Sequence, residues 1–217
     1  MVDLGFKYLR HRLFYSTLEP ASRYARARRM KQWIARMKVV PGHRIIDLGG
    51  LPETWAAIDI PLEVTLLNMP GTSFGEIPSQ HKIELIEGDA CDVAQFGDGS
   101  FDMAFSNSVI EHVGDEPRQA RFAAEARRLG RSYWIQTPAI WFPIEAHTGV
   151  PFWFFYPEPL RQRIIEGWRK KLPAWTEMVE GTRVLSRGTM EELFPDAEIF
   201  VERLGGIPKS YSAYRVR

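Results

Sequence analysis

Between Pro41 and Gln136 the chain contains five short apolar segments, and each one ends in small or polar residues. They cover residues 44–48, 63–68, 83–87, 101–105 and 131–136. Short apolar runs that alternate with helical stretches are typical of an α/β protein, in which helices cover both faces of a mostly parallel sheet. Ligands of such sheets bind beyond the carboxyl ends of the strands, where loops and helix N-termini offer free amide donors. This pattern therefore predicts both the fold class and the place of a site.

Two more segments near the C-terminus, residues 197–204 and 210–216, alternate apolar and polar side chains. The turn residues Gly205, Gly206 and Pro208 lie between them. Alternation on both sides of such a turn predicts two strands joined as an antiparallel hairpin. We expect a mostly parallel seven-stranded sheet with this hairpin at its C-terminal end.

Composition limits what the chain can be. It has 217 residues, of which 45% are hydrophobic, enough for one domain with appendages. Its formal charge of +1 gives no global reason to expect a polyanionic partner. Cys91 is the only cysteine, which excludes an intramolecular disulfide and a cysteine-based zinc site.

Targeting signals are weak. The first residues carry charges where a signal peptide needs an apolar core, and prolines and charges break up the most apolar stretch, residues 133–156. The sequence therefore predicts a cytoplasmic protein without a transmembrane segment. It leaves contact with a membrane surface open, and it says nothing of the oligomeric state.

We predict a basic helical segment over residues 1–40 and the main domain over residues 41–217. In the first segment, many arginines and lysines face only two acids, Asp3 and Glu19. Met30 and Met37 recur at helical spacing, which indicates an amphipathic helix. Its basic side chains either form a solvated face or meet an anion, such as a lipid headgroup or the carboxylate of a cofactor.

The order of these elements over residues 41–217 resembles the class I S-adenosylmethionine-dependent methyltransferases. The resemblance implies a three-layer Rossmann-like fold with S-adenosyl-L-methionine as the cofactor. In that family an acidic residue at the end of the first strand precedes a glycine-rich turn, and Asp47, Gly49 and Gly50 match it. Glycines let the backbone approach the cofactor closely. Leu51 stands where the family has a second glycine, so we expect a different backbone path there.

The resemblance implies further cofactor contacts at later strand ends. Asn68 takes the place of the carboxylate that receives the ribose hydroxyls, and Met69 follows it. Asp89 matches the residue that receives the adenine amino group, with Ala90 beside the ring. Read without the resemblance, Asn68 is an ordinary turn residue and Asp89 a helix cap.

The stretch over residues 101–113 resembles the segment beside the reactive methyl group in small-molecule methyltransferases. It implies that Ser106 and Asn107 lie near the cofactor and His112 near the acceptor. His112 is a candidate general base, because an imidazole can take a hydroxyl proton at neutral pH. Alternatively, it caps or packs the start of the following helix.

An insertion over residues 138–185 follows the fifth strand. Residues 141–156 are long and aromatic for a simple connection, and in the resembled fold this region closes over the acceptor. Glu145 and His147 lie two residues apart. They are candidates for a base and its orienting partner, or for a pair that satisfies itself in a buried loop. Two such ligands alone indicate no metal.

We therefore predict transfer of a methyl group from S-adenosylmethionine to a small-molecule, lipid or saccharide acceptor, at oxygen because candidate bases are available. One alternative is a non-catalytic binding protein of the same fold, which Leu51 and Asn68 favour. Another is an NAD-dependent oxidoreductase, but the required Gly-x-Gly-x-x-Gly turn is missing. A nucleic-acid acceptor is disfavoured, because the basic residues cluster in the first segment.

Overall fold

The computed structural model describes residues 26–145 and 148–217. The chain divides into two compact units, Met1–Val39 and Val40–Arg217. The described part of the first unit is a helix over residues 26–37. It ends at Lys38, whose backbone takes the left-handed conformation with a φ of 51°. The N-terminal part of the predicted basic segment lies outside the described residues.

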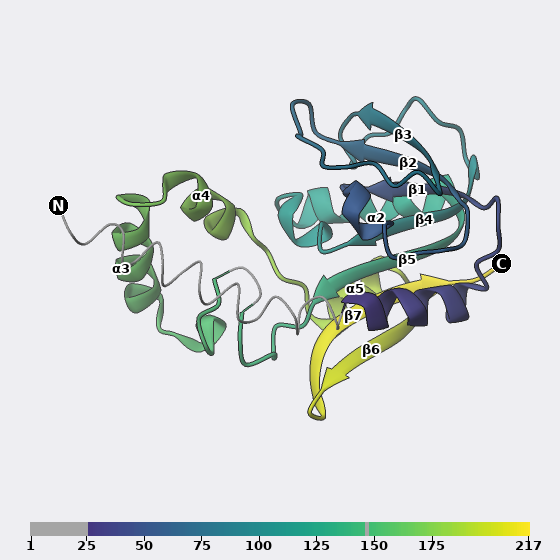
Figure 1. The fold of residues 1–217 in the computed structure, drawn as a ribbon. Helices are drawn as coiled ribbons and strands as arrows, with labels where there is room; N and C mark the ends of the chain where they lie inside the picture. The colour runs from purple at the N-terminus through teal and green to yellow at the C-terminus, as the bar shows by residue number, and fades with distance from the viewer. Residues whose placement is uncertain (1–25, 146–147) are drawn as a thin grey trace. The chain divides into compact units, whose positions relative to one another are not determined.

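The second unit is built on a seven-stranded sheet with the order β3-β2-β1-β4-β5-β7-β6 (Figure 1). β1 to β5 run parallel, whereas β7 is antiparallel to both of its neighbours, β5 and β6. This arrangement confirms the predicted Rossmann-like methyltransferase fold and its C-terminal hairpin. The strands are β1 (Arg44–Leu48), β2 (Glu63–Asn68), β3 (Lys82–Glu87), β4 (Phe101–Asn107), β5 (Gly130–Pro138), β6 (Glu198–Leu204) and β7 (Ile207–Arg215).

Two helices, α2 (Glu116–Leu129) and α5 (Arg187–Leu193), cover one face of the sheet. The core on this face joins strand residues such as Ile46 and Ala104, which pair in register, to Phe122 of α2 and Met190 of α5. Because strand side chains alternate, their neighbours point to the opposite face. That face also carries aromatic side chains of the sheet, including Phe105, which meets Trp55 edge to face at 5.2 Å between ring centroids.

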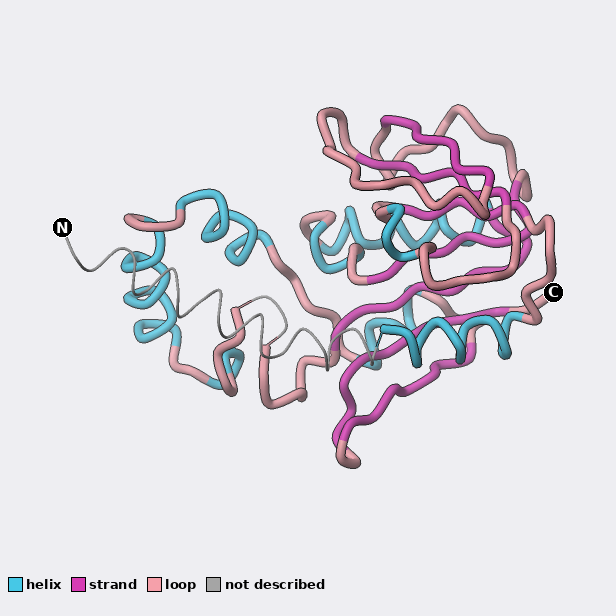
Figure 2. The backbone as a smooth tube through the Cα atoms, in the orientation of Figure 1, coloured by secondary structure: helices cyan, strands magenta, loops and turns pink. Residues whose placement is uncertain are grey.

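The first three connections between strands differ from the predicted alternation of strands and helices. Over residues 49–62, 69–81 and 88–100 the structure has loops and one 3-10 helix, η1 (Pro52–Thr54), in place of α-helices (Figure 2). All three segments are short, and proline and glycine recur in them. Proline removes a backbone donor and glycine costs conformational entropy, so neither favours a helix.

The insertion after β5 consists of η3 (Trp153–Phe155), α3 (Glu158–Arg169) and α4 (Pro173–Gly181). It has an apolar cluster of its own around Trp153, Ile165 and Val179. Trp168 stacks on Trp153 at 5.2 Å and meets Trp175 edge to face at 4.7 Å. A small aromatic core therefore holds this region together, apart from the core on the sheet. Of the helices within the described ranges, none has the length and apolarity needed to cross a membrane.

Candidate functional site

Asp47, at the end of β1, is fully buried. Its Oδ2 accepts a hydrogen bond from Nε1 of Trp55 at 2.9 Å. Its Oδ1 is buried and has no hydrogen-bond partner among the described residues. Burial raises the pKa of Asp47 to about 7, against the opposite effect of the Trp55 hydrogen bond. The end of β1 thus presents an acceptor atom that a bound donor can satisfy.

The turn after Asp47 needs both of its glycines. Gly49 has a φ of 79°, and its amide donates to the carbonyl of Leu67 at 2.8 Å. A Cβ on Gly50 would lie 1.7 Å from Oδ2 of Asp47, so the backbone and the carboxylate occupy adjoining space. Leu51 is then extended and exposed, and η1 begins immediately after it. The different backbone path expected at Leu51 is therefore a short 3-10 turn.

Asn68, at the end of β2, is tied to the same turn. Its side-chain nitrogen donates to the carbonyl of Gly50 at 2.7 Å. The side-chain nitrogen of Asn68 thus donates within the protein, while its side-chain carbonyl oxygen can accept a hydrogen bond from a ligand. Met69, next in the chain, is exposed.

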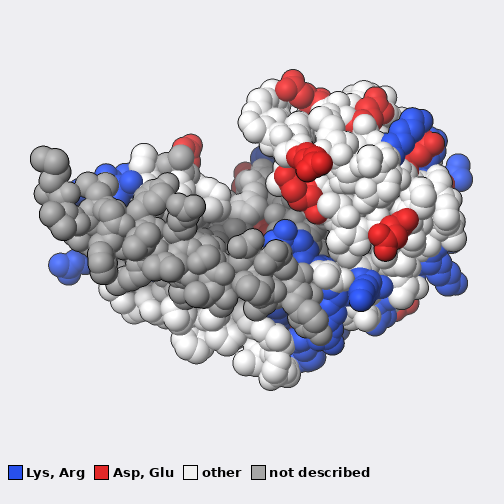
Figure 3. Space-filling view, in the orientation of Figure 1, with Lys and Arg blue, Asp and Glu red and all other residues white. Residues whose placement is uncertain are grey.

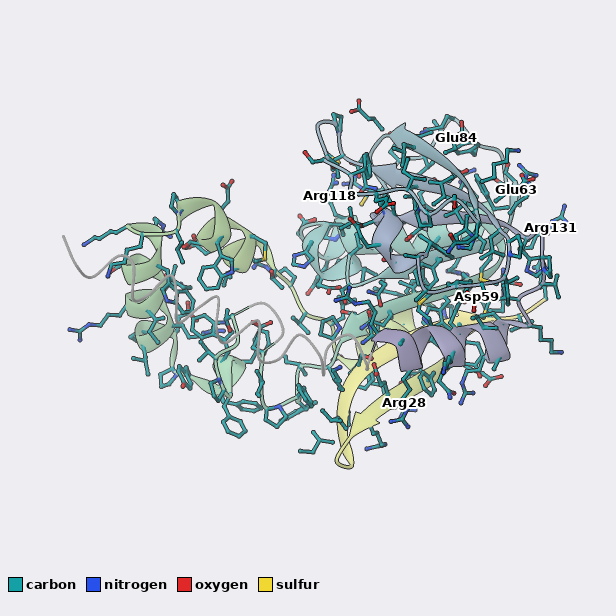
Figure 4. The ribbon with its side chains drawn as sticks, viewed as in Figure 1. Arg28, Asp59, Glu63, Glu84, Arg118 and Arg131 are labelled. Carbon is teal, nitrogen blue, oxygen red and sulfur yellow. The ribbon has the colours of Figure 1, made fainter. Side chains whose placement is uncertain are left out.

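Asp89 follows β3 and forms an ion pair that the sequence reasoning missed. Its Oδ1 accepts from the Cys91 amide at 2.9 Å and from Nη2 of Arg118 at 3.0 Å, and its Oδ2 accepts from the same Nη2 at 2.8 Å. Burial acts to raise the pKa of Asp89, but these partners hold it below its ordinary value. Arg118 also donates to the carbonyl of Val113 through Nε. Figure 4 labels Arg118 near the start of α2. Half-buried Ala90 lies beside Asp89 in the chain.

The end of β4 uses its polar groups largely within the protein. The buried hydroxyl of Ser106 donates to the carbonyl of Leu48 at 2.8 Å, which ties β4 to β1. Asn107 is half-buried. Ser108 adopts a φ of 59° and donates to Oε1 of Gln136 at 2.9 Å. Ser106 therefore holds the sheet together at the place where the sequence predicted a cofactor contact.

His112 is exposed at the end of η2 (Ile110–His112). Its Nδ1 lies 3.3 Å from Oγ1 of Thr182, which itself donates to the carbonyl of Met178 at 2.8 Å. A hydroxyl has a single hydrogen, so in this arrangement Thr182 accepts from an Nδ1–H. The neutral ring then has Nε2 as its basic nitrogen.

The residue before His112, Glu111, was not singled out from the sequence. It is fully buried, and its Oε2 accepts from the hydroxyl of Thr137 at 3.0 Å. Its carbonyl accepts from the amide of Arg183 at 2.7 Å. These two bonds fix the loop after β4 to β5 and to the chain that leaves α4. The sequence feature that could have pointed to Glu111 is its carboxylate between the apolar residues Ile110 and Val113.

A cavity of about 940 Å³ lies between the start of α2 and the insertion. Thr182 belongs to its lining, and His112 contacts Thr182. Two aromatic side chains, Trp153 and Phe154, meet polar ones such as Arg161 and Gln162 around the cavity. The lining thus combines apolar faces with several hydrogen-bonding groups.

Glu145 also lines the cavity and is buried. Its Oε2 accepts a hydrogen bond from the amide of Thr148. His147 lies outside the described residues, so the predicted pairing of Glu145 with it stays a prediction.

The comparisons with known proteins agree with this geometry. A family model described as "Methyltransferase domain" matches residues 60–132, the part of the chain that holds Asn68, Asp89 and His112. No curated protein matches the chain.

Solved structures share the fold at low identity. The N-terminal domain of EvdMO1 with SAH (S-adenosylhomocysteine) bound is 17% identical, with a TM-score of 0.54 over 88% of this chain and 81% of that one. A Thermotoga maritima methyltransferase, described as a possible histamine N-methyltransferase, is 13% identical, with a TM-score of 0.50 over 99% of both chains. A Rhodobacter sphaeroides protein described as a candidate zinc-dependent alcohol dehydrogenase is 13% identical, with a TM-score of 0.52 over 82% and 85%.

At these identities the solved structures show the fold alone. The strand order is that of the Rossmann-like methyltransferase fold, and the match over residues 60–132 supports the prediction of a methyltransferase that uses S-adenosylmethionine as its cofactor.

Proposed function

We propose that this enzyme methylates an oxygen atom of a small polyhydroxylated acceptor, a saccharide or a saccharide headgroup, bound in the cavity beside His112. The observation that carries the proposal is the contact between His112 and Thr182, because it joins a candidate base to the wall of the cavity.

The residues at the strand ends fit the cofactor. The buried Oδ1 of Asp47 lacks a partner among the described residues and suits a donor of the amino-acid portion. The carbonyl oxygen of Asn68 suits a ribose hydroxyl, since its nitrogen is held by Gly50. A carboxylate has about four acceptor positions, and Asp89 uses three of them on Cys91 and Arg118. One position on its Oδ2 remains for the adenine amino group.

The lining of the cavity supports a polyhydroxylated acceptor. Trp153 and Phe154 offer flat apolar faces for the C–H groups of a sugar ring, while Arg161 and Gln162 supply donors for its hydroxyl oxygens. EvdMO1, which shares the fold, was crystallised in the presence of SAH and D-fucose. That protein makes a monosaccharide a sensible first probe for this one.

The chemistry needs a positioned hydroxyl and a proton acceptor. The cofactor supplies a methyl group on a sulfonium, which is an activated leaving group. Nε2 of His112 would take the proton that the acceptor hydroxyl loses when its oxygen replaces sulfur on the methyl group, and would later release that proton to water. The products are a methyl ether and S-adenosylhomocysteine. Thr182 orients the imidazole, and the walls of the cavity supply proximity, which carries most of the rate.

His112→Gln tests the proposal. With a methylated sugar as the product, we expect kcat to fall about 100-fold or more, because base catalysis is lost. Affinity for S-adenosylhomocysteine, measured by calorimetry, should stay within about twofold, since the imidazole of His112 is held by Thr182 of the insertion.

The matched variant is Thr182→Val, which keeps the imidazole but removes its orienting acceptor. It should give a smaller loss of kcat and retain the acidic limb of the pH profile, which His112→Gln should abolish. A wild-type rate in His112→Gln would refute the assignment of the base. Methylation of nitrogen substrates alone, across a panel of sugars and amines, would refute the acceptor class.

A further inference from the structure

The insertion exposes several large apolar side chains on one stretch of chain. Trp141 is 62% exposed, Phe152 56% and Phe155 54%, and Ile144 is exposed as well. The rings of Trp141 and Phe155 lie 5.3 Å apart. We call these four residues the aromatic patch. Isolated exposed apolar residues are ordinary, but a contiguous group of them marks an interaction surface.

The backbone holds the aromatic patch in a defined shape. Ile144 pairs with Pro151 in a β-bridge, and the Phe152 amide donates to the carbonyl of Pro143 at 2.7 Å. Phe152 adopts the left-handed conformation with a φ of 55°, which is unfavourable for a bulky residue. Because the Phe152 side chain is mainly exposed, its packing does little to offset the backbone strain. Backbone strain of this kind is concentrated at functional sites.

The turn between β6 and β7 extends this apolar surface. Leu204 and Ile207 are exposed at the turn, and the cationic residues Arg203 and Lys209 flank them. The amide of Ala139, at the start of the insertion, donates to the carbonyl of Lys209 at 2.9 Å. Both segments lie at the lower edge in Figure 1, and most of the surface that Figure 3 shows along that edge is uncharged.

The stretch that carries the aromatic patch has few charged side chains. Among the described residues between 138 and 157, Glu145 is the one charged side chain, and it is buried. The exposed surface there therefore presents aromatic and aliphatic groups next to the cations of the β6–β7 turn, without an exposed carboxylate from this stretch.

We propose that the aromatic patch and the β6–β7 turn bind the interface of an anionic lipid bilayer. Tryptophan and phenylalanine partition into the interfacial region of a membrane. Lysine and arginine at the surface are attracted by anionic headgroups. A second copy of the chain would gain from the aromatic rings but not from the two cations, so the charge pattern favours lipid.

The aromatic patch adjoins the cavity along the chain. Ile140, Trp153 and Phe154 line the cavity, whereas their immediate neighbours Trp141 and Phe155 belong to the patch. A surface in contact with lipid would thus lie one side chain away from the wall of the cavity. If the proposed function holds, the acceptor is a headgroup that enters from the membrane, but lipid binding itself does not depend on that function.

Flotation of the full chain with vesicles tests the proposal. We expect binding to phosphatidylcholine vesicles that contain about a quarter phosphatidylglycerol, and weaker binding without the anionic lipid. The double variant Trp141→Ser with Phe155→Ser should lower the partition coefficient about tenfold or more. Arg203→Gln with Lys209→Gln should remove the preference for the anionic lipid while leaving the residual binding.

The control is Ile77→Ser, which removes an apolar side chain that is 46% exposed in the connection between β2 and β3. It should bind vesicles like the wild type. Affinity for S-adenosylhomocysteine should be unchanged in every variant, which separates this test from that of the proposed function. The absence of vesicle binding, or an equal loss in Ile77→Ser, overturns the proposal. So does a dimer, seen by sedimentation, that the double variant dissociates while no vesicles are bound.

Discussion

The two sides of the candidate site are held in different ways. On the cofactor side, each strand end is fixed to its neighbour by a hydrogen bond, such as Ser106 to Leu48 or Asn68 to Gly50. On the acceptor side, the insertion relies on its small aromatic cluster around Trp153. The cofactor side is therefore set by the sheet itself, while the acceptor side can change its lining without disturbing the strands. Substitutions on one side should leave the other side's properties largely intact.

The largest effect is expected from Gly50→Ala on the cofactor side. The added methyl group would lie 1.7 Å from Oδ2 of Asp47, so the turn or the carboxylate must move. We expect affinity for S-adenosylhomocysteine to fall about 100-fold or more and stability to fall by about 3 kcal/mol. Calorimetry and denaturant unfolding measure the two quantities.

The matched control for this variant is Gly167→Ala in α3. A Cβ there meets nothing within 4 Å, and alanine is the better helix former. It should stabilise the protein by about 0.5–1 kcal/mol and leave the affinity unchanged. Similar losses of affinity in the two variants would show that the two sides are not independent.

The next effect tests the acceptor side. Trp153→Ala empties the centre of the aromatic cluster, and buried aromatic residues cost about 3 kcal/mol on truncation. Hydrogen exchange should show lost protection in α3 and α4 but not in the strands. The neighbouring Phe152→Ala, at a side chain that is 56% exposed, should change protection little. Lost protection in β1 or β4 would contradict the separation of the two sides.

The sequence predicted the sheet well, because each strand is an apolar run that ends in turn residues. Positions at strand ends could be assigned by order alone, as with Asp47, Asn68 and Asp89. Helices in the first three connections were expected from the apparent alternation of strands and helical stretches, but proline and glycine disfavour helices there.

Contacts made by long side chains could not be predicted in the same way. The bond from Trp55 to Asp47 and the ion pair from Arg118 to Asp89 join residues that no periodicity relates. The same holds for the contact between Thr182 and His112, since it depends on where the insertion returns to the sheet. Such partners follow from the packing of elements rather than from local propensity.

The smallest effect concerns the buried carboxylate of Asp47, which distinguishes the cofactor side by its dependence on pH. Its pKa is raised from 3.8 to about 7 by burial, so the folded state holds the proton more tightly than the unfolded chain does. The resulting stabilisation is fully present below pH 3.8 and is lost as the pH rises through 7. Asp47→Asn removes this dependence and keeps an oxygen that can accept from Trp55.

From pH 5 to pH 8 the wild type should therefore lose about 2.5 kcal/mol of stability relative to Asp47→Asn, as measured by denaturant unfolding in buffers of equal ionic strength. Saturating S-adenosylhomocysteine should make this pH-dependent loss of stability smaller. A ligand donor that hydrogen-bonds to Oδ1 of Asp47, which has no partner among the described residues, favours the ionised carboxylate and so lowers its pKa. Parallel stability curves for the two proteins across this range would mean that Asp47 is already ionised in the folded state. The acceptor atom at the end of β1 would then have a partner other than the cofactor.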